Sequence, residues 1–321
     1  MKSLEDFKNH FTDEIAPTLN RLERQRKIAR NFIIIFSSII AFILIHGILY
    51  FGFLYNEREF NLFEFTKDLE PNMVFAYSLI AFFIVVILFA ILLKFFPFKK
   101  NYKEEIIRPI IDFISSDFIY EPKKHVSNEV VRESKTIIAG YNKLSGDDFV
   151  SGNIHGHPFE ISEIIAEKES RDKKDKQSFT VFHGLFFHST IMKKFDGYVL
   201  LQPAVARFLR DSMGKRVDSA PVELADMTMS ENFVCYSNDD INARKILTPK
   251  LIDLINKFSE KYKKRRLAIS IIDDKLYVGI NYFKNLFEGK YFTSVKDLKH
   301  PMDYYSMLVM ITNILDDLDL A

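Results

Sequence analysis

The stretch DDFVSGNIHGHPFEISEIIAEKES, residues 147–170, decides the fold class of this 321-residue chain. It contains two strand-like runs, DDFVSGNI and HPFEISEIIAEKES, separated by a turn at His155–Gly156. Because so short a turn leaves room only for antiparallel pairing, these residues predict a β-hairpin. The chain is therefore expected to build an antiparallel sheet here.

Alternating strands and helices follow this hairpin. Strand-like runs occur at SFTVFHGLFFHSTIM (178–192), GYVLLQ (197–202), PVELAD (221–226), NFVCYS (232–237), RLAISII (266–272) and KLYVGINY (275–282). Thr248 and Pro249 predict the start of a helix, and Asp273–Asp274 predict a second hairpin turn. VARFLRDSM (205–213), KNLFEG (284–289) and residues 302–319 are expected to be helical. Consecutive hairpins predict the α+β class, with a domain of antiparallel strands and packed helices over residues 125–321.

Two long stretches upstream carry no charge. They lie between Arg30 and Glu57 and between Glu70 and Lys94. A helix needs about 20 residues to cross a hydrocarbon core of about 30 Å, so both stretches qualify. We predict a two-helix transmembrane hairpin over residues 31–96, with spans at about 32–54 and 74–94. Buried helices of a soluble core are the alternative, and the 30 polar residues before the first span argue against a cleaved signal peptide.

The charges beside the spans predict the orientation of the hairpin. Basic residues cluster before the first span and after the second, whereas the loop between the spans is mostly acidic. The positive-inside rule then places both termini in the cytoplasm. Residues expected to contact anionic head groups are Arg24, Arg26, Lys27, Arg30, Lys99 and Lys100. The single ionisable side chain within the spans is His46, which either faces the other helix or stays neutral against a backbone carbonyl.

Two amphipathic helices are expected to flank the hairpin. Residues 1–30 carry an apolar stripe of Leu4, Phe7, Phe11, Ile15, Leu19 and Leu22, and Pro17 should kink or divide this helix. Residues 97–124 carry a second stripe of Ile106, Ile107, Ile110, Ile111, Ile114 and Phe118. The stripes are expected to pack against each other or against the α+β domain, and binding to the membrane surface is the alternative.

Composition excludes several classes of protein. Lys and Arg total 44 against 43 for Asp and Glu, a net charge of +1, so nucleic acid is not an expected partner of the chain as a whole. The basic run at residues 257–266 reads as a solvated helix end, with anionic lipid or nucleic acid as alternatives. Cys235 is the single cysteine, which excludes an internal disulfide and a cysteine-based zinc cluster. We expect no cofactor and no metal.

Four histidines, His155, His157, His183 and His188, fall close together in the sequence. His183 and His188 are an odd number of residues apart, as are Glu160 and Glu163, so the members of each pair should face opposite sides of a strand. The histidines are therefore expected to be unrelated sheet and turn residues and not ligands of one metal. The usual phosphate-loop, dinucleotide, hydrolase and zinc-protease motifs are absent from the sequence.

The stretch YSNDDINARKILTP, residues 236–249, carries the most polar chemistry. Asp239, Asp240 and Arg244 are candidates for a polar ligand site, with His183 as a further candidate. The alternative is that the aspartates cap a helix and that Arg244 forms a structural ion pair.

Four stretches come in a familiar order, namely GDDFVSGNIHGHPFEISEIIAE, FTVFHGLFF, FVCYSNDDINARKILTPKLIDLI and ISIIDDKLYVGINYFKNLFE. Over residues 100–290 the chain resembles the bacterial domain of unknown function 3137 family, and YSND…AR.ILTP is the central element of this resemblance. The resemblance implies a protein of the bacterial inner membrane with a cytoplasmic α+β domain. It brings no catalytic residues with it.

Three functions remain open at this point. The chain is expected to be a membrane-anchored binding or scaffold module, whose partners are the lipid bilayer and either a second copy or another protein. An enzyme of unfamiliar class is the first alternative, with His183 or the group of Asp239, Asp240 and Arg244 acting on a small anionic or lipid-derived substrate. A small oligomeric channel or transporter is the second alternative.

Overall fold

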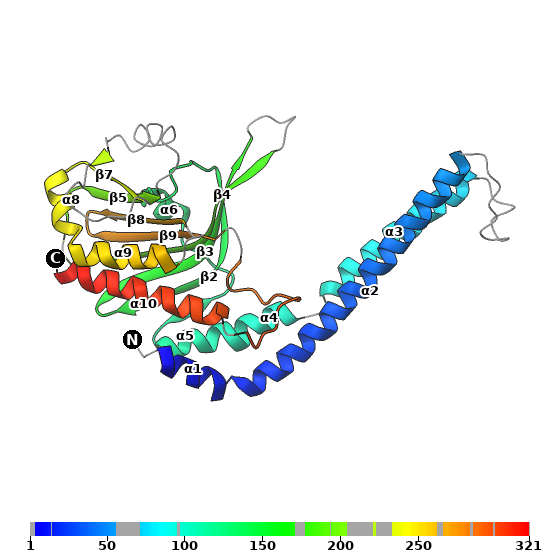
Figure 1. Cartoon of the computed structure of the whole chain (residues 1–321), viewed down its shortest axis with the longest axis horizontal. Coiled ribbons are helices and arrows are strands. Elements are labelled where there is room, and N and C mark those ends of the chain that lie inside the picture. Colours follow the sequence, from blue (N-terminus) through cyan, green and yellow to red (C-terminus); the bar gives the residue numbers. More distant parts are fainter. Residues whose placement is uncertain are drawn as a thin grey trace. The chain divides into compact units, whose positions relative to one another are not determined.

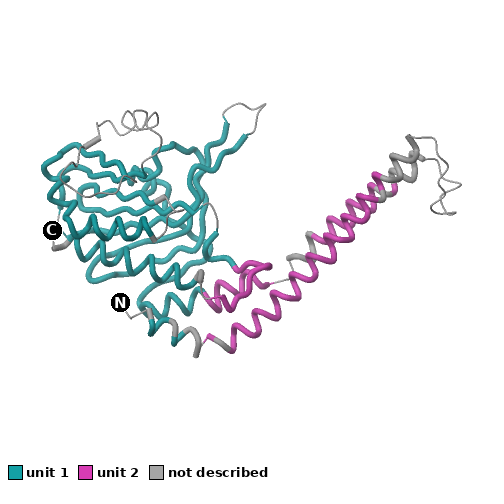
Figure 2. The backbone as a smooth tube through the Cα atoms, viewed as in Figure 1, with its two compact units in different colours: residues 1–12, 107–288, 298–321 teal, residues 13–106, 289–297 magenta. Residues whose placement is uncertain are grey.

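The computed structural model describes residues 4–13, 15–55, 71–94, 97–170, 177–192, 194–203, 221–222, 233–261, 266–282, 285–297 and 299–320. The chain divides into two compact units (Figure 2). Unit 1 comprises residues 1–12, 107–288 and 298–321, and unit 2 comprises residues 13–106 and 289–297. Unit 1 thus contains the predicted α+β domain from residue 125 onward, together with residues 107–124 of the predicted juxtamembrane helix.

Unit 1 is built on one antiparallel sheet. Among the described residues its order is β1-β2-β3-β4-β9-β8-β5-β7-β6. The strands are β1 (Ile119–Glu121), β2 (Lys143–Ile154), β3 (His157–Glu169), β4 (Ser178–Thr190), β5 (Tyr198–Pro203), β6 (Pro221–Val222), β7 (Phe233–Ser237), β8 (Arg266–Ile272) and β9 (Lys275–Asn281). The predicted α+β class is confirmed.

The hairpin of β2 and β3 forms as the sequence predicts. Ile154 pairs with His157, and the turn residues His155 and Gly156 have φ angles of 53° and 98°. Two residues with positive φ match the twist of the flanking strands, which is why a glycine is suited to the second position. The hairpin of β8 and β9 also forms, with Ile272 opposite Lys275 across Asp273–Asp274.

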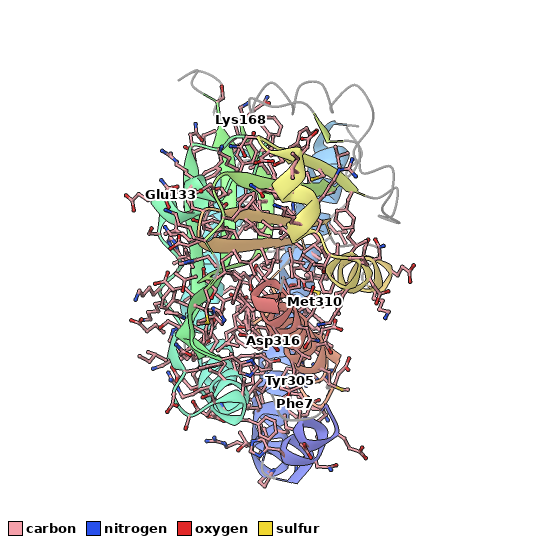
Figure 3. All side chains as sticks on the ribbon, turned by 90° about the vertical axis from the view of Figure 1, so that its left-hand side faces the viewer. Phe7, Glu133, Lys168, Tyr305, Met310 and Asp316 are labelled. Atoms are coloured by element: carbon pink, nitrogen blue, oxygen red, sulfur yellow. The ribbon has the colours of Figure 1, made fainter. Side chains whose placement is uncertain are left out.

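Helices cover both faces of the sheet. Helix α6 (Asn128–Glu133) packs on one face through Val131, against Phe149, Ile164, Phe186 and Tyr277. Helices α9 (Pro249–Lys261) and α10 (Lys299–Leu320) lie on the other face (Figure 1). Figure 3 places Glu133 of α6 and Met310 of α10 on opposite sides of the sheet. Since side chains alternate along a strand, the odd-numbered residues of β3 near Ile161 and Glu163 face α10.

The remaining helices of unit 1 are α1 (Leu4–Asp13), α5 (Arg108–Ile114) and α8 (Asp240–Ile246). Helix α1 packs on α10, because the ring of Phe7 stacks on that of Tyr305 at a centroid distance of 4.6 Å. Phe113 of α5 joins the same aromatic group, 5.7 Å from Phe7. Helix α9 begins as predicted, because Thr248 Oγ1 accepts a hydrogen bond from Leu251 N at 3.1 Å.

Two of the predicted helices, KNLFEG and VARFLRDSM, are not found among the described residues. The run KNLFEG is not helical in its described part, where residues 286–288 form bends, so that prediction is wrong. The backbone N–H of Leu286 donates to a carboxylate of β3 at 3.0 Å, and a run of six residues is too short to form a helix by itself. The run VARFLRDSM lies outside the described residues.

Unit 2 consists of long helices and one short returning segment. Its helices are α2 (Ala16–Tyr55), α3 (Pro71–Lys94), α4 (Phe98–Tyr102) and a single π-helical turn from Lys103 to Ile107. Helix α1 ends at Asp13 and α2 begins at Ala16, so the predicted division at Pro17 is confirmed. Helix α2 then runs without interruption past Arg30, the predicted border between the flanking helix and the first span.

Among the described residues, the stretch Pro17–Ile45 of α2 is long and apolar enough to cross a membrane, and its most apolar 18 residues have a mean hydropathy of 2.3. Helix α3 contributes a shorter apolar stretch, Leu79–Phe89. The two helices are in contact, since the ring of Phe89 stacks on those of Phe32 and Phe36 at 5.9 and 5.2 Å. The backbone at His46 is helical, and its side chain is outside the described part of the structure.

Candidate functional site

The four predicted ligand-binding residues do not come together. Asp239 caps α8, because its Oδ1 accepts hydrogen bonds from the backbone of Ile241 and Asn242, each at 3.0 Å. Asp240 and Arg244 lie on the exposed side of the same helix. His183 is on β4, which is separated from β7 and this helix by β9, β8 and β5. At about 4.8 Å per strand, this separation is about 19 Å.

His183 instead bonds to Glu163 on the neighbouring strand. Its Nε2 lies 3.1 Å from Glu163 Oε1, and this hydrogen bond raises the pKa of His183 against the opposing effect of burial. The other oxygen of Glu163 accepts the backbone N–H of Leu286 at 3.0 Å. Both oxygens of this carboxylate, which is 2% exposed, are thereby fixed in position.

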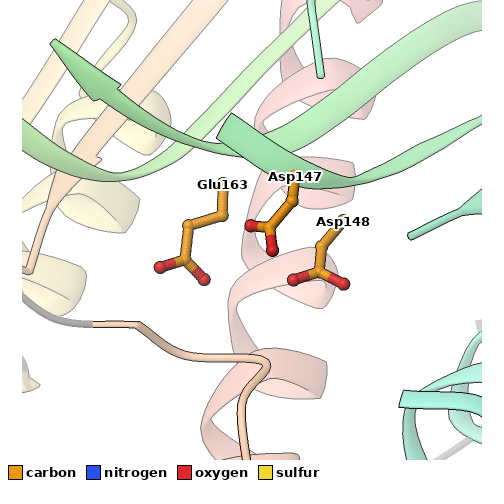
Figure 4. A group of neighbouring side chains, drawn as sticks. All are labelled: Asp147, Asp148 and Glu163. Carbon is orange, nitrogen blue, oxygen red and sulfur yellow. The ribbon is translucent and has the colours of Figure 1, made fainter. Parts of the chain in front are cut away.

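Two aspartates of β2 lie beside Glu163 (Figure 4). Asp147 is directly opposite Glu163 in the ladder, and the register between β2 and β3 then shifts between Asp147 and Val150. Asp148 within this bulge has a φ of 55°. A bulge breaks the alternation of side chains along a strand, so consecutive residues can lie on the same side. One carboxylate oxygen of each of the three residues lies within 4.8 Å of the other two.

Two tyrosines adjoin these carboxylates. Tyr120 of β1 donates a hydrogen bond from its hydroxyl to Asp148 Oδ1. Tyr304 of α10 is 4% exposed, and its hydroxyl has no hydrogen-bond partner among the described residues. Burial raises the pKa of both phenols, and the negative charge of Asp148 adds to the effect at each. Both hydroxyls therefore stay protonated. The ring of Tyr304 packs edge-on against that of Phe287 at 4.5 Å, next to Leu286, which bonds to Glu163.

We name Asp147, Asp148 and Glu163 the carboxylate cluster. The sequence pattern predicts only ordinary strand positions for these three residues. The available signal was the pair of consecutive aspartates within a strand-forming run, because aspartate is depleted in strands. Regular alternation would have placed the two on opposite faces, so the pattern alone could not predict that they meet.

The other predicted candidates have separate partners. His155 bonds to Asp316 at 2.7 Å, His157 to the carbonyl of Thr190 at 2.8 Å, and His188 to Glu160 at 2.9 Å. Because Glu160 and Glu163 bond to His188 and His183 respectively, the prediction that each pair divides between the two faces agrees with these contacts. Cys235 is 3% exposed, and burial raises the pKa of its thiol to about 12. Such a thiol is not a nucleophile at neutral pH.

A second polar group lies in unit 2, at the start of α2. The guanidinium of Arg26 donates to Glu23 from Nε at 3.0 Å and from Nη2 at 2.7 Å, and it also donates to the carbonyl of Tyr291. Glu23 Oε2 further accepts from Ser294 Oγ at 3.2 Å and from Val295 N at 3.1 Å. This ion pair therefore holds the segment 289–297 against α2.

The basic residues predicted to contact head groups differ in exposure. Arg24, Lys27, Lys99 and Lys100 are exposed, and Arg30 is half-buried. Arg26 departs from the expectation, because it is 4% exposed and engaged by Glu23 and Tyr291. A glutamate three residues earlier on the same helix face explains the difference.

The ion pair predicts a pH dependence of stability. The hydrogen bond from Arg26 lowers the pKa of Glu23 from 4.5 to about 2. Because the folded pKa is lower than the unfolded one, the pair stabilises the fold above pH 4.5 and loses this contribution as the pH falls toward 2. The contribution is about 3 kcal/mol at most. Thermal unfolding of the full chain in detergent at pH 7, 4.5 and 3 should show a larger decrease in Tm for the wild type than for Glu23→Gln.

The fold defines a class of protein in which an α+β domain on one antiparallel sheet is joined in the chain to long apolar helices. Residues 180–320 match the model of a family described as a protein of unknown function (DUF3137). The predicted resemblance to this family is thereby confirmed. The match begins at β4, later than predicted, and it extends to α10, beyond the predicted end at residue 290.

No curated protein matches the chain. The crystal structure of the mycobacterial trehalose monomycolate transport factor A superposes with a TM-score of 0.35 at 10% sequence identity, covering 65% of this chain and 94% of that chain. A score this low carries no inference about the fold or function of the present chain.

Proposed function

We propose that this chain is a two-span protein of the bacterial inner membrane whose cytoplasmic α+β domain is a binding or scaffold module. The two spans are supported by α2 and α3, which pack against each other through Phe32, Phe36 and Phe89. Helix α3 has 24 residues, which correspond to about 36 Å at 1.5 Å per residue. That length is sufficient to cross a hydrocarbon core of about 30 Å.

The outward side chains of these helices support a lipid environment. Phe42 and Ile48 of α2 are 63% and 70% exposed, and Ile87 of α3 is 56% exposed. A contiguous apolar surface of this kind is unfavourable in water and marks contact with a membrane or a protein. The exposed Lys99 and Lys100, together with Arg24 and Lys27, favour the orientation with both termini in the cytoplasm.

The observation that carries the proposal is how the chain joins the two units. It passes between them after residues 12, 106, 288 and 297. The last two passages bracket the segment 289–297, which follows the sheet strands in the chain and is held to α2 by Glu23 and Arg26. Four passages of the chain between the units favour a domain that stays attached to its membrane anchor.

The described carboxylates do not favour an enzyme. Asp148 and Glu163 of the carboxylate cluster are 1% and 2% exposed, so an organic substrate would have no access to them. The residues of the alternative enzyme site do not come together either, because three strands separate His183 on β4 from β7, the strand that leads into α8. The channel alternative depends on Ser37, Ser38 and His46. Ser38 Oγ donates to the carbonyl of Ile34 in its own helix at 2.9 Å, and the side chain of His46 is outside the described residues.

Affinity purification of the full chain in mild detergent tests the module. We expect a defined protein partner, or self-association, that survives purification. The matched control is Gly184→Ala, which should disrupt the sheet and leave the two spans in the membrane. Partners that the wild type retains and the control loses support the proposal. Equal recovery from both chains, or no partner and no self-association, would contradict it.

The proposed topology has its own test. A reporter fused after Ala321 should be active in its cytoplasmic form alone, and the chain should require detergent for extraction from membranes. Activity of the reporter on the outer side of the membrane would refute the two-span anchor. Recovery of the chain in the aqueous fraction without detergent would refute it as well, and neither result depends on a binding partner.

A further inference from the structure

We infer that the carboxylate cluster of Asp147, Asp148 and Glu163, together with the hydroxyl of Tyr304, binds one hard divalent cation, of the class of Ca²⁺, Mg²⁺ or Mn²⁺. The site lies between the bulge of β2 and helix α10, within unit 1. This inference does not depend on the membrane topology or on the proposed binding function.

The spacing of the oxygen atoms suits a single ion. One oxygen from each carboxylate lies within 4.8 Å of the others. Oxygen ligands bind such cations at about 2.0–2.6 Å, so two of them on one ion are at most about 5 Å apart. The bulge is what makes this geometry available, since it adds Asp148 to the directly opposed pair of Asp147 and Glu163.

The surroundings favour a cation energetically. Asp148 is 1% exposed and Glu163 is 2% exposed, and both lie next to a third carboxylate. Like charges this close in a medium of low polarity repel each other strongly. A divalent cation between them would turn this repulsion into attraction, in a place where water cannot screen it.

Tyr304 supplies the independent observation. Its side chain is 4% exposed, and its hydroxyl has no hydrogen-bond partner among the described residues. A buried hydroxyl without a partner is costly, and native structures rarely leave one. The ring of this tyrosine packs edge-on against Phe287 at a centroid distance of 4.5 Å, and the preceding residue, Leu286, bonds to Glu163 at 3.0 Å, so the phenol lies beside the cluster. Direct ligation, or a hydrogen bond to a water molecule on the ion, would satisfy the hydroxyl.

The donor atoms select the class of ion. All four are oxygens, which hard cations prefer, whereas zinc and copper favour nitrogen and sulfur. His183 is bonded to Glu163 through Nε2 at 3.1 Å, and Tyr120 donates to Asp148. These contacts orient two of the carboxylates, as hydrogen-bond partners of metal ligands commonly do. The ion would thus connect β2 and β3 to α10.

The test uses the full chain in detergent, stripped with a chelator and then titrated separately with Ca²⁺, Mg²⁺, Mn²⁺ and Zn²⁺. Isothermal titration should show one equivalent of at least one of the first three ions and weaker binding of Zn²⁺. At 100 times the Kd, the ion should raise Tm by about 5 °C or more. The inference is overturned if none of the three binds at millimolar concentration.

Three variants locate the site. Asp147→Asn, at a half-buried position, should weaken the affinity at least about tenfold. Tyr304→Phe removes a single oxygen and should weaken it severalfold, while the metal-free Tm stays the same or rises because the unpaired hydroxyl is gone. Glu160→Gln is the matched control on the opposite face of β3, and it should bind the ion as the wild type does. Wild-type affinity in Asp147→Asn or in Tyr304→Phe would refute the site.

Discussion

Gly184→Ala should destabilise unit 1 by about 3 kcal/mol or more. Gly184 lies on β4, which is paired on both sides, with β3 and with β9. A Cβ atom at this position would lie 2.0 Å from the carbonyl oxygen of Ile280. That oxygen belongs to the backbone of a central strand, so it cannot move away without breaking the ladder between β4 and β9. The requirement for glycine here is steric.

Thermal or chemical unfolding of the full chain in detergent measures this effect, and Gly279→Ala is the matched control. Gly279 lies on the neighbouring strand β9, and its added Cβ would meet Phe182 at 3.4 Å, an ordinary contact. We expect a change of less than about 1 kcal/mol for this control. Equal losses of unfolding free energy in both variants would show that the carbonyl oxygen of Ile280 is not what excludes a methyl group at residue 184.

Arg26→Leu should release the segment 289–297 from α2. The substitution removes both hydrogen bonds to Glu23 and the one to the carbonyl of Tyr291, and it leaves a buried carboxylate without its counter-charge. Breaking one partner of a buried ion pair costs about 3–5 kcal/mol. Since about 1.4 kcal/mol is a factor of ten, local opening should become at least about 100 times more frequent.

Limited trypsin digestion of the full chain reports on this opening, because Lys290 and Lys296 are exposed cleavage sites within the segment. When opening is fast, the cleavage rate follows the population of the open form. The matched control is Arg24→Leu, two residues away on the exposed side of α2, and its cleavage rate should equal that of the wild type. An unchanged rate in Arg26→Leu would mean that the ion pair does not hold the segment.

Local signals explain why much of unit 1 could be predicted from the sequence. His155–Gly156 and Asp273–Asp274 specify two hairpins, since each pair supports the backbone angles of a tight turn. Thr248 and Pro249 specify the start of α9 through a single capping hydrogen bond. These features depend on neighbouring residues and therefore leave a pattern in the sequence.

The carboxylate cluster could not be predicted in this way. Glu163 meets Asp147 through the register of two strands, Asp148 joins them through a bulge, and Tyr304 comes from a helix about 140 residues later. None of these relationships has a fixed spacing. The predicted site at Asp239, Asp240 and Arg244 had the opposite weakness, because a capping aspartate and a ligand aspartate look alike in sequence.

The contacts of Arg26 are a third feature that could be predicted only in part from the sequence. A basic residue next to an apolar span is usually expected to contact head groups, and its exposed neighbours Arg24 and Lys27 fit that expectation. Glu23, three residues before Arg26, is a sequence signal for an ion pair. The sequence gives no sign that Tyr291 and Val295, more than 260 residues away, complete this group.

The stacking of Phe7 on Tyr305 has a consequence for biosynthesis. At a translation rate of about 5–20 residues per second, roughly 15–60 s separate the synthesis of these two rings. During that interval the apolar stripe of α1 has no α10 to cover it, while the hydrophobic helices that follow have already emerged from the ribosome. The nascent chain therefore exposes an apolar surface next to a bilayer until its last helix has been synthesised. In that period it is most prone to aggregate and to bind chaperones.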